Sequence, residues 1–340
     1  MRIAIDAMGG DRAPAVPVEG ALEALNLLGN GFEIILVGNR ELIEKDLSRR
    51  HYKDSRLEIV HASQVVEMDD SPSVALKKKR DSSISVGLRM QKEDTADAFV
   101  SAGNTGAIMA QSLMTLGRIE GISRPAIVTI FPSRIQPVVF LDVGANVDSK
   151  PFHLLHFALM GSIYAQEILG RENPKVGLLN IGEEAKKGDE LSVATYKMLD
   201  ESPLNFIGNA EGRDILDGVT DVVVCDGFVG NVVLKFSESI IHLVTSMIKS
   251  EIRKSPVRRL GSMLMRGAYK NIQRTLDYAE YGGAPLLGID GVVVVCHGGS
   301  SPKAIRNAIN VARLTVTRRV NETIETRLSE LSNAKAVKLS

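Results

Sequence analysis

The sequence contains no tryptophan, and aromatic side chains make up only 4% of its 340 residues. Proteins that bind nucleic-acid bases or sugars by stacking need exposed aromatic rings, so this class of partner is disfavoured. Lysine plus arginine and aspartate plus glutamate number 41 each, so the formal net charge is zero. A neutral chain has no bulk electrostatic attraction to nucleic acid. We therefore expect no nucleic-acid partner.

Cysteine is also scarce, and both cysteines, Cys225 and Cys296, end valine-rich runs. Two such cysteines do not make a disulfide framework, and a thiol at the end of a buried strand behaves as a small apolar group. The chain opens directly into an apolar segment without a signal peptide, and no apolar run approaches the ~20 residues that span a bilayer. We expect a cytoplasmic protein.

Several motifs that identify common chemistries are missing from the sequence. It has no G-x-G-x-x-G dinucleotide fingerprint and no G-x-x-x-x-G-K-[ST] phosphate loop. It also has no H-E-x-x-H, C-x-x-C or G-x-S-x-G, which would indicate zinc, redox or serine-hydrolase chemistry. We therefore predict no cofactor and no metal.

Valine- and isoleucine-rich segments alternate with helical patterns along the whole chain. The apolar runs are continuous, which is typical of parallel strands buried on both faces. We predict one three-layer α/β/α domain over residues 1–335 with a mostly parallel sheet. The expected strands include residues 3–7, 34–37, 57–60, 98–100, 126–131, 137–142, 176–181, 222–225 and 292–295, and residues 206–212 are expected to form a strand and turn.

Glycine turns follow several of these strands, and the clearest is residues 101–106, with Gly103 and Gly106. Glycine lets the backbone approach a ligand closely, and the N–H groups of a helix that begins at Thr105 would attract an anion such as phosphate. Because ligands of parallel sheets bind beyond the carboxyl ends of the strands, we expect the turns to converge on one edge. Helix capping alone also explains any single turn of this kind.

Acidic side chains lie in or beside these turns. Asp6, Asp11, Asp142 and Asp226 could hold a magnesium ion or position a base. For each one alone, we favour a structural role in capping a helix or bonding the turn backbone.

Basic side chains near the turns offer a second set of candidates. Lys187 and Lys235 could neutralise a phosphate, or lie on the surface. His297 precedes two glycines. It could act as an acid, as a base or as a hydrogen-bond donor to phosphate, or it could form a hydrogen bond with the turn backbone.

Four segments in order, residues 3–11, 101–107, 141–146 and 225–235, together resemble the bacterial phosphate acyltransferase family, and residues 79–83, 179–184 and 187–188 match as well. The resemblance covers nearly the whole chain. It implies the isocitrate/isopropylmalate dehydrogenase-like fold of phosphotransacetylases. It also implies transfer of a long-chain acyl group from acyl carrier protein to inorganic phosphate. The acyl phosphate then supplies a membrane glycerol-3-phosphate acyltransferase in phospholipid synthesis.

In this reaction phosphate is itself the nucleophile, so the site must hold an anion beside a thioester and stabilise an oxyanion. We therefore assign catalytic roles to Asn104, Lys187 and His297, with His297 protonating the leaving thiolate. The predicted phosphate- and substrate-binding residues are Asp6, Gly9, Gly10, Gly103, Thr105, Asn146, Asn231 and Lys235.

Residues 248–274 differ from the rest, because eight cations and one acid alternate there with large apolar residues. We predict a helical protrusion over about residues 240–280, broken at Pro256. Its apolar residues Leu260, Met263 and Leu264 indicate contact with a membrane surface. A homodimer arm and a dock for the acidic carrier protein are the alternatives.

Three other functions remain open at this point. A phosphotransacetylase-like enzyme would use acyl-coenzyme A instead of the carrier protein. A nicotinamide dehydrogenase of the same fold would need metal-binding aspartates and a cofactor loop that the sequence does not reveal. A non-catalytic membrane scaffold for lipid enzymes would form no acyl phosphate.

Overall fold

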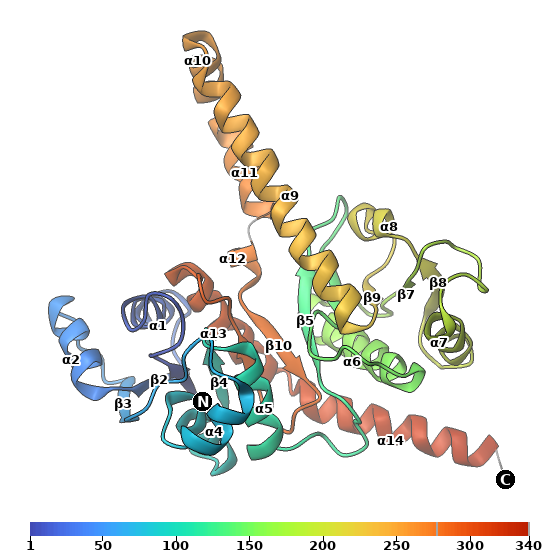
Figure 1. The fold of residues 1–340 in the computed structure, drawn as a ribbon, viewed down its shortest axis with the longest axis horizontal. Helices are drawn as coiled ribbons and strands as arrows, with labels where there is room; N and C mark the ends of the chain where they lie inside the picture. Colours follow the sequence, from blue (N-terminus) through green and yellow to red (C-terminus); the bar gives the residue numbers. More distant parts are fainter. Residues whose placement is uncertain (277, 339–340) are drawn as a thin grey trace.

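The computed structural model describes residues 1–276 and 278–338. There the chain forms one sheet with helices on both faces (Figure 1). The strands are β1 (Arg2–Asp6), β2 (Glu33–Gly38), β3 (Leu57–His61), β4 (Ala98–Ser101), β5 (Ala126–Phe131), β6 (Val138–Leu141), β7 (Val176–Leu179), β8 (Phe206–Ala210), β9 (Val222–Val224), β10 (Ala284–Leu287) and β11 (Val293–Val295). The helices are α1 (Ala15–Leu27), α2 (Arg40–Arg49), α3 (Pro72–Lys78), α4 (Ser83–Lys92), α5 (Thr105–Thr115), α6 (Pro151–Leu169), α7 (Glu190–Asp200), α8 (Gly212–Asp217), α9 (Gly227–Arg253), α10 (Pro256–Leu264), α11 (Arg266–Leu276), α12 (Tyr278–Tyr281), α13 (Pro302–Thr317) and α14 (Val320–Lys338).

The strand order is β3-β2-β1-β4-β11-β10-β5-β6-β9-β7-β8. The first five strands of this order pair in parallel, and so do the last four. Between them, β10 is antiparallel to β11 and to β5, and β5 is antiparallel to β6. A mostly parallel sheet between two helical layers confirms the predicted fold class.

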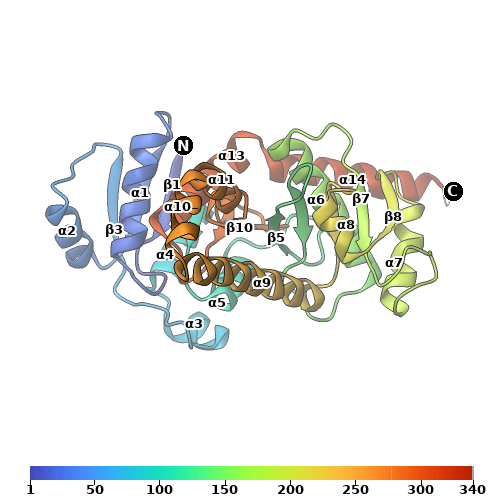
Figure 2. The ribbon, with the colours of Figure 1, turned by 90° about the horizontal axis from the view of Figure 1, so that it is seen from above.

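The expectation that all the glycine turns share one edge of the sheet is wrong. Three antiparallel pairings reverse the direction of the sheet, so β6, β9 and β7 run opposite to β1, β4 and β11. The turns after the two sets of strands therefore form two clusters. The helices that follow β4 and β9 nevertheless lie on one side of the molecule, where Figure 2 shows α5 and α9.

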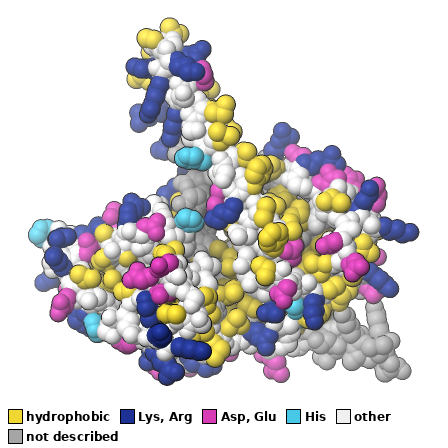
Figure 3. All heavy atoms as spheres, in the orientation of Figure 1, with side chains coloured by type: hydrophobic (Ala, Val, Ile, Leu, Met, Phe, Trp, Pro, Cys, Tyr) yellow, Lys and Arg dark blue, Asp and Glu magenta, His cyan; other side chains and the backbone are white. Residues whose placement is uncertain are grey.

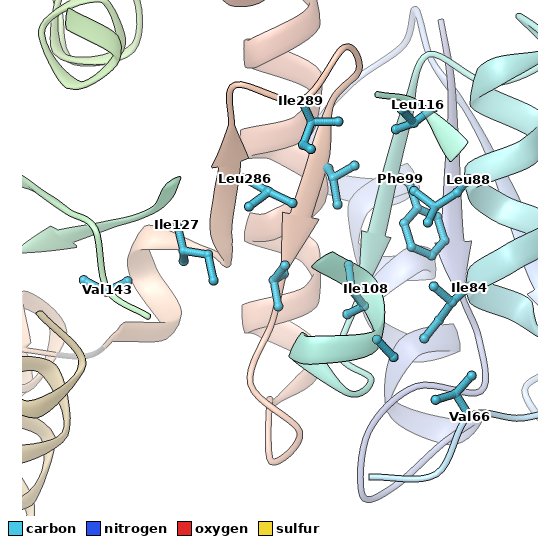
Figure 4. Packing of buried hydrophobic residues seen from close by; sticks show 14 of the residues in the cluster. Val66, Ile84, Leu88, Phe99, Ile108, Leu116, Ile127, Val143, Leu286 and Ile289 are labelled. Atoms are coloured by element: carbon cyan, nitrogen blue, oxygen red, sulfur yellow. The ribbon is translucent and has the colours of Figure 1, made fainter. Parts of the chain in front are cut away.

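The first half of the sheet carries a dense core beneath α4 and α5. Ile84, Leu88, Phe99 and Ile108 pack there from three elements (Figure 4). Gly87 makes this packing possible, because a Cβ at its position would lie 2.3 Å from Cε2 of Phe99. On the opposite face α1 packs on α13, while α6 and α14 cover the second half.

A helical arm, consisting of α9, α10 and α11, projects from the body of the protein (Figure 1). The break expected at Pro256 is confirmed, because α9 ends at Arg253 and α10 begins at Pro256. The arm starts earlier than composition indicates, since only Gly227 and Gly230 of α9 are buried. By length and composition alone α9 could cross a membrane, which differs from the sequence expectation.

Candidate functional site

The turns after β1, β4 and β11 meet the start of α4 at one end of the first half of the sheet. We call residues 6–11, 82–83, 101–106 and 297–300 the N-terminal turn cluster. At its centre the buried carboxylate of Asp6 accepts hydrogen bonds from Ser101 Oγ at 2.6 Å and from the Met8 backbone N at 3.0 Å. Ser83 also hydrogen-bonds to it. Asp6 therefore joins three segments of the chain and is not exposed to a substrate.

The glycines of this cluster are required by close packing. A Cβ at Gly9 would lie 2.4 Å from Oδ2 of Asp6 and 2.7 Å from the backbone N of Gly103. Gly10 has a φ of +97°, which favours glycine, and a Cβ there would lie 2.9 Å from the carbonyl oxygen of Gly298. These glycines shape the turn, and their direct contact with substrate stays a prediction.

The start of α5 is fixed by the side chain of Asn104. Its Oδ1 accepts a hydrogen bond from the Ala107 backbone N at 2.9 Å, which caps the helix. Its Nδ2 donates to the carbonyl oxygens of Met68 and Asp70, both at 2.9 Å. The amide is therefore occupied, and the prediction that Asn104 itself holds phosphate is not supported.

The backbone ahead of this cap remains suited to an anion. Thr105 is exposed, and in the described part of the chain no hydrogen bond is seen from the backbone N–H groups of Thr105 and Gly106. Those two N–H groups point out of the helix at its positive end. The N–H groups, rather than the Asn104 amide, are the donors that can meet a phosphate.

His297 lies exposed in the loop after β11. Its Nδ1 is 3.1 Å from the backbone N of Gly299, which donates a hydrogen bond to it. Because Nδ1 accepts, the proton of the neutral ring lies on Nε2. In this form Nε2–H can donate a hydrogen bond, whereas the predicted acid role requires the cationic ring, in which Nδ1 also carries a proton and cannot accept from Gly299. Protonation of the thiolate by His297 stays a prediction.

A second group of turns, residues 142–146 and 225–231, follows β6 and β9, and we call it the C-terminal turn cluster. Buried Asp142 accepts bonds from the backbone N of Ile127, Ala145 and Asn146 at 3.0, 3.0 and 2.8 Å. The Nδ2 of Asn146 donates to Asp142 at 2.9 Å and to the Pro125 carbonyl at 2.7 Å. The prediction that Asn146 holds phosphate is therefore not supported, because its amide hydrogens are already bonded.

Asn231 is the polar residue of the C-terminal turn cluster that remains accessible. It is exposed on the first turn of α9, and its Cγ lies 3.5 Å from where a Cβ of Gly144 would be. Asp226 caps this helix by accepting bonds from the backbone N of Phe228 and Val229. Asp226 has the structural role that we favour, and substrate binding by Asn231 stays a prediction.

The two candidate lysines lie apart from the N-terminal turn cluster. The ammonium of Lys187 is 3.9 Å from Glu184 in the loop after β7, and that of Lys235 is 2.9 Å from Glu238 on α9. Both side chains are about half exposed, at 52% and 51%. Surface ion pairs of this kind are weak, so either lysine could exchange its partner for a substrate phosphate.

Burial shifts the pKa values of the two thiols and of two buried carboxylates. It raises the pKa of Cys225 well above its ordinary value and raises the pKa of Cys296 to about 12. Burial likewise raises the pKa values of Asp6 and Asp142, although hydrogen bonds oppose the shift. Neutral thiols are poor nucleophiles, so a thiol intermediate is disfavoured. Among the residues described, no three His, Cys, Asp or Glu side chains gather as metal ligands.

Sequence reasoning missed the polar contacts that hold the N-terminal turn cluster together. Ser83 and Ser101 bond to Asp6, and Asn104 ties down the loop before α3. Residues 79–83 belong to the family resemblance, and that is the signal that could have placed Ser83 in the site.

Comparison with known proteins identifies the family. Residues 1–323 match the family described as "Fatty acid synthesis protein". The phosphate acyltransferase of Heliobacterium modesticaldum is 56% identical over 92% of this chain and 93% of its own length. The phosphate acyltransferase of Desulfitobacterium hafniense strain DCB-2 is 53% identical over 98% of this chain and 99% of its own.

Solved structures of lower identity share the fold. A phosphotransacetylase from Streptococcus pyogenes has a TM-score of 0.60 at 18% identity, covering 96% of this chain and 94% of its own. A branched-chain phosphotransacylase from Enterococcus faecalis also has a TM-score of 0.60, at 14% identity, over 93% and 99%. Because the chain is more than half identical to these two relatives over nearly its full length, it belongs to the phosphate acyltransferase family and is an acyltransferase.

Proposed function

We propose that this phosphate acyltransferase moves a long-chain acyl group from acyl carrier protein to inorganic phosphate, forming acyl phosphate for phospholipid synthesis. The observation that carries the proposal is the start of α5, where the backbone N–H groups of exposed Thr105 and half-buried Gly106 make no hydrogen bond within the described chain. Such a helix end binds phosphate without a metal or a dinucleotide motif. Family membership supplies the reaction class, and this anion site supplies a place for the nucleophile.

The reaction then needs few side chains. A phosphate oxygen attacks the thioester carbon, the C–S bond breaks, and the thiolate takes a proton to leave as the free thiol. Hydrogen phosphate releases its own proton as acyl phosphate forms, and that proton balances the thiolate. The Nε2–H of His297 can donate a hydrogen bond to the leaving sulfur, since its Nδ1 accepts from the Gly299 backbone N. Backbone N–H groups stabilise the charge that develops on the thioester oxygen.

The test is phosphate-dependent release of free carrier protein by the purified chain. With a long-chain acyl–carrier protein, release should require phosphate, yield acyl phosphate and persist with a chelator present. Long-chain acyl-coenzyme A at equal concentration is the control donor. Preference for acyl-coenzyme A would favour the phosphotransacetylase alternative, and absence of turnover with both donors would favour the scaffold.

We further propose that the tip of the arm rests on the inner face of the cell membrane. Leu260, Met263 and Leu264 are 63%, 71% and 85% exposed there. Figure 3 shows apolar and basic side chains side by side at this tip. Exposed apolar side chains among cations suit an anionic lipid surface. This location would bring acyl phosphate to a membrane glycerol-3-phosphate acyltransferase.

Vesicle binding tests the membrane proposal. Leu260→Glu/Leu264→Glu should abolish co-sedimentation with vesicles that contain anionic phospholipid, while activity in solution is kept. Ile135→Glu is a suitable control, because Ile135 is 75% exposed but lies between β5 and β6, outside the residues of the arm. Vesicle binding that persists in the double variant would contradict the proposal.

A homodimer through α9 is the third part of the proposal. Phe228, Val232, Phe236 and Ile240 recur every four residues and are 63%, 54%, 67% and 41% exposed. Residues at this spacing share one face of a helix, and so large an apolar face suits a second copy of the chain. Phe236→Glu should therefore convert a dimer to a monomer in light scattering, and an unchanged mass would contradict this interface.

A further inference from the structure

A run of four cations, residues 77–80, joins the end of α3 to the turn before α4. Lys79 is committed to an ion pair with Asp70. Lys77, Lys78 and Arg80 are exposed, and no ion pair to them is seen within residues 1–276 and 278–338. We call these three residues the basic patch. Figure 3 shows Lys and Arg side chains gathered low on the left half of the molecule, where Figure 1 labels α4.

One acid, Asp81, directly adjoins the basic patch, so three cations stand against one carboxylate. The Asp81 carboxylate accepts bonds from the Ser63 backbone N at 2.9 Å and from Ser63 Oγ at 2.6 Å. Glu67 and Asp69 are exposed, but they precede α3, at the other end of that helix from the cations. The patch therefore presents positive charge to an approaching partner.

The basic patch lies at the border of the N-terminal turn cluster. On one side, Asn104 holds the carbonyl of Asp70, two residues before α3. On the other side, Ser83 bonds to Asp6. Arg80 is three residues from Ser83, so their Cα atoms are at most about 11 Å apart. A protein bound at the patch would stand beside the backbone N–H groups of α5.

These observations favour an acidic protein as the partner. The cations of the arm are interspersed with exposed Leu and Met, whereas Lys77, Lys78 and Arg80 follow one another without an exposed apolar residue between them. We propose that the basic patch is the docking surface for acyl carrier protein, an acidic protein that carries its thioester on a flexible tether. This inference rests on the proposed function, and it places the dock beside the site instead of on the helical arm. Charge complementarity of this kind mainly raises the rate of encounter.

Charge reversal tests the proposal. Lys77→Glu/Lys78→Glu is compared with Lys249→Glu/Lys270→Glu, which makes the same charge change on the arm at two exposed positions. We measure kcat/KM with a long-chain acyl–carrier protein and with the matching acyl-pantetheine thioester, at low and high salt. The patch variant should lose tenfold or more with the carrier protein at low salt, and much of the difference should vanish at high salt. Its activity with acyl-pantetheine and its KM for phosphate should equal those of wild type, and the control should match wild type throughout.

Three results would overturn the docking surface. Unchanged kcat/KM with the carrier protein would remove the patch from recognition. An equal loss with acyl-pantetheine, or a raised KM for phosphate, would assign the cations to the phosphate site. A loss confined to the arm variant would move the dock to the arm. If wild type used acyl-pantetheine but not the carrier thioester, the proposed function would fail as well, which separates that failure from failure of the dock alone.

Discussion

Removing the side chain of Asn104 should weaken both the fold and phosphate binding. Asn104→Ala deletes the cap of α5, the bond from the Ala107 backbone N at 2.9 Å. It also deletes the bonds to the carbonyls of Met68 and Asp70, both at 2.9 Å. Losing an N-cap costs about 1 kcal/mol, the half-buried hydrogen bond to Asp70 costs about 1 kcal/mol, and the exposed hydrogen bond to Met68 costs less. The free energy of unfolding should therefore fall by about 2 to 3 kcal/mol.

Urea unfolding and steady-state kinetics measure the two consequences. A start of α5 that is no longer held should bind phosphate less well, so we expect the KM for phosphate to rise tenfold or more. Asn104→Asp is the matched variant. It keeps the acceptor for the Ala107 N–H, but it loses the donor to the carbonyl groups and adds a negative charge where phosphate binds.

Asn104→Asp should therefore lose about 2 kcal/mol of stability and raise the KM for phosphate at least as much as Asn104→Ala. If Asn104→Ala unfolded within about 0.5 kcal/mol of wild type, the side chain would not be the clamp that its contacts indicate. If both variants kept the wild-type KM for phosphate, the start of α5 would not be the anion site.

The remaining predictions concern the close packing and the titrating groups. Gly9→Ala should lower the free energy of unfolding, measured in urea, by about 3 kcal/mol. The new Cβ would lie 2.4 Å from Asp6 Oδ2 and 2.7 Å from the Gly103 N. Wild-type stability would contradict that packing. Cys225→Ala and Cys296→Ala should each keep kcat within about twofold, because both thiols stay protonated; loss of turnover in either would revive a thiol intermediate. Burial raises the pKa of Asp6 above 3.8. Wild type should therefore gain stability relative to Asp6→Asn as the pH falls from neutral through that raised pKa. A stability difference between the two proteins that stays constant with pH would contradict a buried charge.

Local sequence predicted much of the fold. Valine- and isoleucine-rich runs became strands, and turns with capping residues became helix starts, as at Asn104 and Asp226. The reversal of the sheet was not predictable in this way, because an apolar run encodes a strand but not its direction. The strand β10 (Ala284–Leu287) is only four residues long, follows two glycines and was not expected. Its two antiparallel pairings cancel, so β5 runs in the same direction as β11, and the antiparallel pairing of β5 with β6 splits the turns into two clusters.

The sequence predicted where the site lies better than it predicted which hydrogen bonds the site residues make. Gly9, Gly10 and Gly103 do lie together, as their motifs indicate, because each turn follows a neighbouring strand of the first half. The bonds of Asn104 reach backbone carbonyls more than 30 residues earlier in the chain, and a carbonyl acceptor leaves no signature in the sequence. For the same reason, only the structure shows that both amide hydrogens of Asn146 are used in hydrogen bonds to Asp142 and Pro125.

The proposed reaction requires that inorganic phosphate attack the thioester directly. The decisive measurement uses phosphate labelled with oxygen-18 at all four oxygens, together with a long-chain acyl–carrier protein, and weighs the acyl phosphate by mass spectrometry. Direct attack predicts a product that retains all four labelled oxygens and forms only when phosphate is present. Loss of one labelled oxygen, or carrier protein released equally fast without phosphate, would contradict it.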